Sequence, residues 1–355
     1  MLRKTKNGLS FILMLVLSLL LLRTLYLNIN TYDKLTRPLP LDNSLLVDST
    51  ATPSDQNNQK KASQGMEFPK DEGEHHNLLN EWWYFSSHLE DDRDPTNKFG
   101  ITLVFFKKNK RLLFNLTDGV NQKNFSSVIN LDSYDILGRD RLMLKKGDFQ
   151  WLEVEPFKYQ INFRYRDKEF NLDLVALKPP FIILNNDDSF YYTQTRLEVT
   201  GDLLLGPESY YKIRGTGWIN HEGFKETSSW KSWRWYNLQL NNGIEIALTS
   251  HLVSREGTFY DKGDLFIFRE EREIIEGQKY FIRDLEYWED ARTKIHYPIK
   301  WQIWIPESKI DLIATSIIPD QVIDGSHGIY EGTYEVEGIF EGQSVVGRAQ
   351  FELKP

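Results

Sequence analysis

The chain has 355 residues, with 40% hydrophobic and 26% charged side chains, a formal net charge of −8 and no cysteine. Its length accommodates one large or two ordinary globular domains. The negative charge disfavours nucleic acid or an anionic membrane surface as the main partner. The lack of cysteine excludes disulfides, thiol nucleophiles and zinc–thiolate sites.

The N-terminus carries a targeting signal. Arg3, Lys4 and Lys6 precede an apolar run, residues 9–22, which has the length of a secretory hydrophobic region. No small-residue cleavage site follows this run. We therefore expect residues 1–27 to form an uncleaved signal anchor, with the basic flank cytoplasmic and the folded part extracytoplasmic. The alternative is a cleaved signal peptide and a secreted protein.

Residues 28–66 are polar, interrupted by prolines and without periodicity, which predicts a disordered linker. Beyond this linker the pattern becomes typical of β-structure. Phe99, Ile101, Leu103 and Phe105 share one parity, as on a largely buried strand.

Alternating segments then predict hairpins. Residues 161–174 alternate about an Asp167-Lys168 turn. Residues 238–248 alternate about Asn241-Asn242-Gly243, and Asn-Gly between alternating runs is a strong hairpin signal. The tail, 334–351, repeats the pattern around Gly338.

These short strands, at a spacing of roughly ten residues, predict an all-β fold built as barrels or sandwiches. Closure into barrels would remove exposed strand edges. We place a domain boundary near residue 225, which divides the folded part into an N-terminal domain, 67–225, and a C-terminal domain, 226–355.

Two aromatic–acidic clusters stand out, Glu81-Trp82-Trp83-Tyr84-Phe85 and Gly217-Trp218-Ile219-Asn220-His221-Glu222. Tryptophan is costly to expose, and its N–H needs a partner when buried. The clusters therefore predict an apolar cavity that contains a few polar groups. Because Trp82 and Trp83 are adjacent, they point to opposite faces of a strand.

The first cluster resembles the E-W-W-Y opening, and the second the W-M-D-H-E signature, of the carotenoid 1,2-hydratase (CrtC-like) and AttH-domain family. Further pieces of the chain resemble that family in the same order: Tyr191-Tyr192-Thr193, Trp233-Arg234-Trp235-Tyr236, Tyr297-Pro298-Ile299-Lys300-Trp301 and Tyr330-Glu331-Gly332. The resemblance implies two lipocalin-like antiparallel β-barrels in tandem.

The resemblance also implies a reaction, the hydration of an isoprenoid double bond. Such a reaction protonates carbon, so it needs a carboxylic acid with a raised pKa and aromatic faces that stabilise a cation. The candidate catalytic residues are Glu222, Glu81 and His221. The candidate ligand-binding residues are Trp82, Trp83, Tyr84, Trp218, Asn220, Trp235, Tyr192, Tyr330 and Glu331.

One position departs from the family pattern. Asn220 stands where the family has aspartate, and an amide cannot act as a general acid. Either Glu222 or Glu81 takes over that role, or the chain does not hydrate. Pericyclic cyclisation, which needs shape and hydrogen bonding, is compatible with the amide.

Other functions are compatible with the same residues. A non-catalytic carrier or sensor would hold a lipid in the barrel, and a surface module would stack tryptophans on sugars. The tryptophans can also be core residues, and His221 with Glu222 a polar lock between domains. The histidines show no metal-ligand spacing, so we expect no metal or cofactor. The expected partners are a hydrophobic small molecule and, through the N-terminal segment, a membrane.

Overall fold

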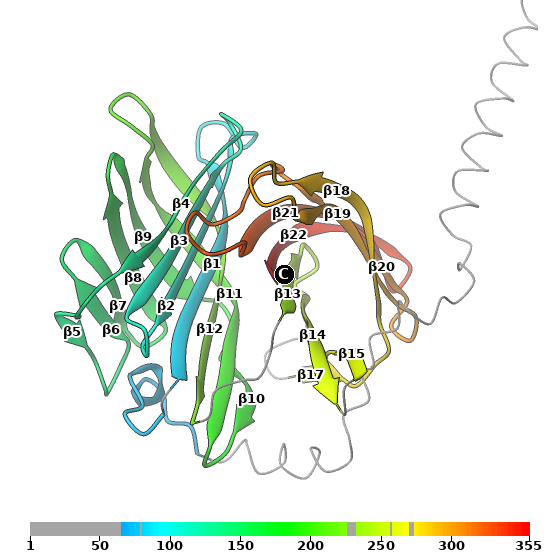
Figure 1. Ribbon diagram of the computed structural model, residues 1–355, viewed down its shortest axis with the longest axis horizontal. Coiled ribbons are helices and arrows are strands. Elements are labelled where there is room, and N and C mark those ends of the chain that lie inside the picture. Colours follow the sequence, from blue (N-terminus) through cyan, green and yellow to red (C-terminus); the bar gives the residue numbers. More distant parts are fainter. Residues whose placement is uncertain (1–64, 79, 226–231, 256–257, 270–272) are drawn as a thin grey trace, which may run out of the picture. The chain divides into compact units, whose positions relative to one another are not determined.

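The computed structural model describes residues 65–78, 80–225, 232–255, 258–269 and 273–355 (Figure 1). The predicted signal anchor and nearly all of the predicted linker lie outside these residues. Within them, no helix is long and apolar enough to span a membrane. The single helical segment in this part of the chain is a 3₁₀ turn, η2 (Lys70–Glu72).

The first sheet has twelve antiparallel strands, in the order β4-β3-β2-β1-β12-β11-β9-β8-β7-β6-β5, with β10 paired to β11. Their bounds are β1 (Asn80–Asp91), β2 (Lys98–Phe106), β3 (Arg111–Asp118), β4 (Lys123–Asn130), β5 (Ile136–Leu137), β6 (Met143–Lys146), β7 (Phe149–Glu155), β8 (Lys158–Tyr165), β9 (Lys168–Ala176), β10 (Phe181–Asn185), β11 (Ser189–Leu204) and β12 (Tyr210–Phe224).

The second sheet has ten antiparallel strands, in the order β17-β16-β14-β13-β22-β21-β20-β19-β18, with β15 paired to β14. Their bounds are β13 (Trp233–Leu240), β14 (Glu245–Arg255), β15 (Thr258–Lys262), β16 (Leu265–Arg269), β17 (Glu273–Glu276), β18 (Phe281–Glu289), β19 (His296–Ile305), β20 (Ile310–Ser316), β21 (Tyr330–Phe340) and β22 (Gln343–Lys354). The predicted all-β class is confirmed as two curled antiparallel sheets in tandem (Figure 1).

The predicted strand and the three predicted hairpins are present. In the tail, however, Gly338 lies inside β21, and the turn is at Glu341-Gly342 instead. The apolar parity of β2 is almost fully buried, with exposed fractions of 0–1%. Asn241-Asn242-Gly243 joins β13 to β14, and Gly243 has a φ of 81°, a left-handed conformation that glycine adopts without strain. The β8–β9 turn lies at Arg166-Asp167, one residue earlier than predicted.

Each sheet curls around its own apolar core. Trp83, Phe85 and Trp151 belong to the core of the first sheet, and Tyr236 and Trp301 to that of the second. A third apolar cluster joins side chains of both sheets, including Tyr84 and Val104 of the first and Trp235 and Phe268 of the second. We call this contact region between the sheets the seam.

Buried polar side chains also cross the seam. Asn237 Nδ2 donates to Ser86 Oγ at 3.3 Å, and Gln350 Nε2 donates to Thr102 Oγ1 at 3.0 Å. The sheets approach closely at Gly100, where a Cβ atom would lie 2.0 Å from Thr333 Oγ1. The described residues belong to one compact unit, held by these contacts.

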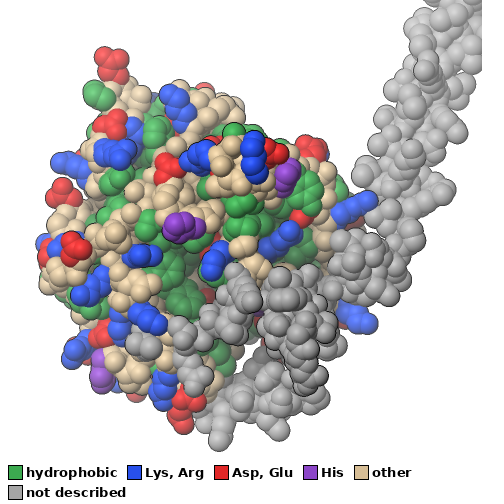
Figure 2. Space-filling model, viewed as in Figure 1, with side chains coloured by type: hydrophobic (Ala, Val, Ile, Leu, Met, Phe, Trp, Pro, Cys, Tyr) green, Lys and Arg blue, Asp and Glu red, His purple; other side chains and the backbone are tan. Residues whose placement is uncertain are grey.

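The surface mixes charges of both signs. On the face shown in Figure 2, Lys and Arg side chains are interspersed with Asp and Glu. A mixed surface of this kind, on a chain of net charge −8, lacks the basic stripe typical of nucleic-acid binding on that face.

Candidate active site

Strand β12 directs one stripe of side chains toward the second sheet. Trp218, Asn220 and Glu222 alternate along it, as the period of two in a strand requires. Trp218 and Asn220 are buried, whereas Glu222 is half-buried. In the neighbouring strands, Tyr84 pairs with Asn220 and Trp82 with Glu222, so these side chains share the same face.

Aromatic rings line this part of the seam. The rings of Tyr84 and Trp235 meet edge-on with centroids 5.0 Å apart. Trp218 contacts Trp235 at 6.2 Å and Phe268 at 6.0 Å, also edge-on. Such pairs add to the free energy of apolar burial, and each ring also offers an electron-rich face. We call Tyr84, Trp218, Trp235 and Phe268 the aromatic seam.

Three carboxyl groups lie at this part of the seam. Glu331 of β21 and Glu352 of β22 are directly paired. Their side chains therefore lie on the same face of the second sheet, the face that forms the seam. Glu331 is fully buried; its Oε2 accepts hydrogen bonds from Tyr84 Oη at 3.3 Å and Gln350 Nε2 at 3.1 Å. Glu352 Oε1 accepts a hydrogen bond from Trp233 Nε1 at 2.7 Å. We call Glu222, Glu331 and Glu352 the acid cluster.

Burial disfavours the charged form of each carboxyl in the acid cluster. It raises the pKa of Glu222 to about 8, and the nearby charge of Glu352 raises it further. It raises the pKa of Glu352 to about 7, against the opposing hydrogen bond from Trp233. Burial and the charge of Glu352 also raise the pKa of Glu331 well above its ordinary value. The cluster therefore holds protons at neutral pH and can act as an acid.

Asn220 lies beside the acid cluster as a hydrogen-bond acceptor. Its Oδ1 accepts the Trp218 Nε1–H at 2.8 Å and the Tyr191 hydroxyl at 3.5 Å. The amide thus fixes the orientation of an indole of the aromatic seam. It carries no acidic proton, so proton donation at this site falls to the neighbouring carboxyls.

The opposite face of the same strands carries a second polar group inside the first sheet. Glu81, whose side chain is fully buried, accepts a hydrogen bond from His221 Nε2 at 3.0 Å and lies 2.9 Å from His75 Nδ1. Lys107 Nζ donates to its other oxygen at 2.9 Å. We call these four residues the Glu81 network.

The charges of the Glu81 network compensate one another. Burial alone would raise the pKa of Glu81. Hydrogen bonds from His221 and His75 outweigh burial and lower this pKa to about 2. Burial lowers the pKa of His221 to about 4, so its imidazole is neutral. The pKa of His75 rises to about 9 because its bonds to Asp71 and Glu81 outweigh burial.

The donor atoms of His75, Glu81 and His221 all lie within 4.8 Å of one another, a spacing that could hold a metal ion. Each atom is already engaged in a hydrogen bond or ion pair, however, and the Lys107 ammonium supplies positive charge to Glu81. The arrangement is that of a satisfied ion-pair network. The spacing of these residues in the sequence does not predict that His75, Glu81 and His221 lie together, because they come from separate segments.

The other predicted residues are divided by the same alternation. Trp83 stacks on His221 with ring centroids 4.4 Å apart, and Tyr192 lies near the same imidazole, so both belong to the interior of the first sheet. Tyr330 is buried in the core of the second sheet. Trp82 is half-buried on the seam side and stacks on Phe224.

Sequence reasoning missed several polar groups. Glu352 was not singled out, although it and Glu331 are equidistant from the turn at Glu341-Gly342, which pairs them in any regular hairpin. Glu72 of η2 was also missed; it accepts hydrogen bonds from Tyr159 Oη at 2.6 Å and Gln194 Nε2 at 2.9 Å. Burial raises the pKa of Glu72 to about 8.

Comparison with known proteins agrees with this architecture. The AttH-like family model matches residues 114–354. An AttH protein from Nitrosomonas europaea is 20% identical, with a TM-score of 0.68, over 82% of this chain and 97% of that chain. Kievitone hydratase from Nectria haematococca is 12% identical, with a TM-score of 0.66, over 87% of this chain and 97% of that chain. No curated protein matches the chain in sequence.

Proposed function

Because the chain belongs to the AttH-like family, we propose that it binds an apolar, isoprenoid-like molecule between its two lipocalin-like sheets and adds water to a carbon–carbon double bond. The observation that carries this proposal is the acid cluster beside the aromatic seam. A carboxyl that remains protonated at neutral pH, as Glu222 does, next to electron-rich rings, is what protonation of an alkene requires.

Glu222 is the proposed proton donor. Like Glu352, and unlike the fully buried Glu331, it keeps part of its surface exposed. Its pKa of about 8 is raised by burial and by the charge of Glu352, whereas the Trp233 hydrogen bond opposes the rise at Glu352. The proton of Glu222 passes to one carbon of the double bond, which leaves a carbocation on the other carbon and a carboxylate on Glu222. Trp218, Trp235 and Tyr84 offer the ring faces that stabilise the cation.

Glu352 is the proposed base. Its pKa of about 7 leaves a large fraction ionised at neutral pH, and the Trp233 N–H supports the charged form. A water molecule attacks the cation, and its surplus proton passes to the Glu352 carboxylate. The alkene and one water become an alcohol, and return of that proton to Glu222 restores the site.

The relatives are consistent with this proposal without fixing the substrate. One structural relative is by name a hydratase, but its identity of 12% limits the likeness to the fold. The isoprenoid character of the ligand is what the resemblance to the carotenoid 1,2-hydratase family implies, and the aromatic and carboxyl groups of this chain are compatible with it. A carrier that holds such a ligand without reaction is the competing function.

The test incubates the full chain with short terpenoid alkenes in heavy-oxygen water and follows products by mass spectrometry. We expect a labelled alcohol, and a loss of rate of about a hundredfold or more in Glu222→Gln. Glu155→Gln, an exposed carboxyl with 64% of its side chain accessible, is the matched control. Equal rates in both variants would overturn the assignment of Glu222.

Two other results point to different functions. Saturable binding of the alkene without any product would identify a carrier. An unlabelled product that is isomeric with the substrate would identify cyclisation, with Asn220 as a hydrogen-bonding group.

We also propose that the protein is tethered to a membrane with its folded part extracytoplasmic. The support is the apolar run at 9–22 behind a basic flank. Expression of the full chain followed by cell fractionation and protease treatment tests this: the folded part should be protected only while the outer barrier is intact. Recovery in the soluble cytoplasmic fraction would reject the tether.

A further inference from the structure

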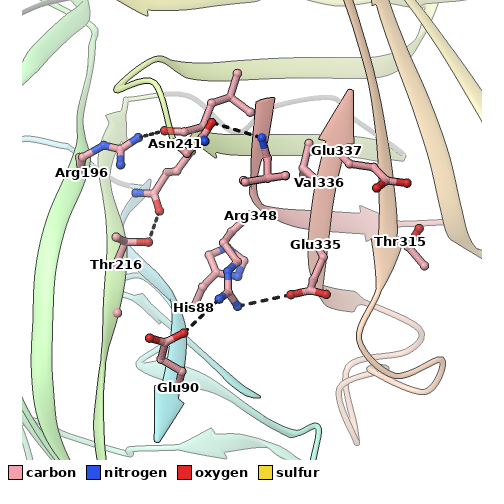
Figure 3. Close-up of a pocket in the computed structure, with 15 residues that line it drawn as sticks. His88, Glu90, Arg196, Thr216, Asn241, Thr315, Glu335, Val336, Glu337 and Arg348 are labelled. Atoms are coloured by element: carbon pink, nitrogen blue, oxygen red, sulfur yellow. Dashed lines mark hydrogen bonds and ion pairs between the residues drawn. The ribbon is translucent and has the colours of Figure 1, made fainter. Parts of the chain in front are cut away.

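A cavity of about 630 Å³ opens at the far end of the seam from the acid cluster. Along β1, His88 and Glu90 follow Tyr84, and along β22, Arg348 precedes Glu352. Strands of both sheets line the cavity, as Figure 3 shows. Its lining includes no residue of the acid cluster or of the aromatic seam, so it is a separate site.

His88 is an unpaired polar group on the wall of this cavity. It is 4% exposed, and neither ring nitrogen has a hydrogen-bond partner among the described residues. Burial and the nearby charge of Arg348 lower the pKa of His88 to about 3, so the ring is neutral. A neutral imidazole offers one N–H donor and one lone-pair acceptor, and leaving both unmade when buried costs free energy.

Arg348 lies between two carboxylates, 3.4 Å from Glu90 and 3.9 Å from Glu335, and Figure 3 shows this chain of charges across the cavity. These two carboxylates are also paired outside the cavity lining, Glu90 with Arg214 and Glu335 with Lys98. Arg196, the other cation of the lining, is engaged by Glu245 and by the Leu240 carbonyl. Because a third carboxylate, Glu337, also lines the cavity, the described residues of its wall carry no excess of positive charge that would attract an anion.

The lining also differs from a site for an apolar ligand. Leu240, Val336 and Val346 contribute small aliphatic surfaces, and no Phe, Tyr or Trp of the described residues lines the cavity. Carboxylates accept hydrogen bonds, guanidinium donates them, and the imidazole does both. A hydroxyl group, which both donates and accepts, matches this set of partners.

From the cavity, the unpaired His88 and the wall charges of both signs, we propose that this end of the seam binds a neutral, hydroxyl-rich small molecule such as a sugar or cyclic polyol. The hydroxyls donate to Glu90 and Glu335, and accept from Arg348 and the imidazole of His88. Nothing in this proposal requires the chemistry proposed for the acid cluster.

The test uses the full chain and three probes, glucose, trehalose and myo-inositol, with inorganic phosphate as the anionic comparison. Binding is followed by calorimetry and by the NMR signals of the histidine ring nitrogens. We expect saturable binding of at least one of the three neutral probes, with the ring signals of His88 shifted. The signals of the exposed His296 serve as the internal control.

Variants separate a binding role from a structural one. His88→Phe keeps the ring size and removes both unpaired nitrogens, so we expect affinity to fall about tenfold while thermal stability is unchanged or higher. Glu335→Gln, whose side chain is 46% exposed, should also weaken binding without loss of fold. His296→Phe and Glu155→Gln should leave the affinity unchanged.

Each remaining outcome decides against the proposal. Saturation by phosphate alone would overturn the neutral class of ligand. Failure of all three neutral probes to saturate, or affinity unaffected by His88→Phe, would mean that water alone satisfies the imidazole. Glu222→Gln, which tests the proposed hydration, should not alter sugar binding, so the two proposals can fail separately.

Discussion

Tyr84 of β1 donates a hydrogen bond across the seam to Glu331 of β21, with 3.3 Å between the hydroxyl and Oε2. Both residues are buried, and they come from different sheets and from parts of the sequence 247 residues apart. This contact ties the packing of the two sheets to the protonation of the acid cluster. A change at Tyr84 should therefore alter both stability and titration.

Tyr84→Phe should destabilise the fold by about 1–2 kcal/mol, because it removes the donor from a buried carboxyl and leaves the ring in place. It should also raise the pKa of Glu331 further, since the lost hydrogen bond favours the charged form. Urea unfolding measures the first effect. Tyr287→Phe, at an exposed tyrosine, is the control, and equal midpoints for the two variants would contradict the prediction.

The pH dependence of stability should reflect the acid cluster. The folded-state pKa of Glu222, about 8, lies above its ordinary value of 4.5, so the unfolded chain ionises first as pH rises. The stability that Glu222 contributes is fully present below about pH 4.5 and is lost as pH rises through about 8. Glu222→Gln should therefore flatten the decline over this range, by on the order of 1–3 kcal/mol.

Unfolding free energies at several pH values, compared with those of Glu155→Gln, provide the measurement. His75, whose pKa of about 9 is also raised, loses its contribution in an overlapping range, and the comparison between variants cancels it. A decline of the same size in wild type and Glu222→Gln would show that Glu222 is ionised in the folded protein at neutral pH.

An aspartate at position 220, the residue that the resemblance implies for the family, provides a second test of the proposed reaction. Asn220→Asp retains an oxygen that accepts the Trp218 N–H and adds a group that can carry a proton. Burial beside Glu222 should raise the pKa of the new carboxyl, so we expect faster hydration and lower stability above neutral pH. Turnover of the alkene measures the first effect. A rate below that of the wild type would indicate that the amide itself is required, as cyclisation would need.

Glu81→Gln should act on stability and leave the reaction per folded molecule unchanged. Glu81 compensates the charges of His75 and Lys107, and removing one partner of a buried ion pair costs about 3–5 kcal/mol. Thermal unfolding provides the measurement, with turnover normalised to the folded fraction. If turnover per folded molecule falls as far in Glu81→Gln as in Glu222→Gln, Glu81 takes part in catalysis and the prediction is wrong.

The alternation of residues explains what the sequence could and could not predict. The parity of Phe99 to Phe105, the Asn-Gly hairpin and the opposite directions of Trp82 and Trp83 follow from local geometry, and the structure confirms them. The same rule separates Glu81 from Glu222: odd positions of β1 and β12 point into the first sheet, and even positions point to the seam.

Long-range packing accounts for the remainder. Glu352 lies close enough to Glu222 to affect its pKa only because the second sheet packs against the first. The cavity beside His88 likewise needs strands of both sheets. No pattern within one strand carries this information, because it depends on which sheet face meets which.

Trp233→Phe separates the proposed base from the proposed acid. The indole N–H donates to Glu352 at 2.7 Å and favours its charged form, while the ring itself lies under the Lys354 ammonium at 4.7 Å. Phenylalanine keeps an aromatic face for that cation and removes the donor, so the pKa of Glu352 should rise. If Glu352 acts as the base, it must be ionised, and the acidic limb of the kcat/KM profile should move up by about one pH unit.

Trp304→Phe, at the more exposed indole of β19, should leave the limb in place. A shift of the alkaline limb alone would instead make Glu352 the proton donor and exchange its role with that of Glu222.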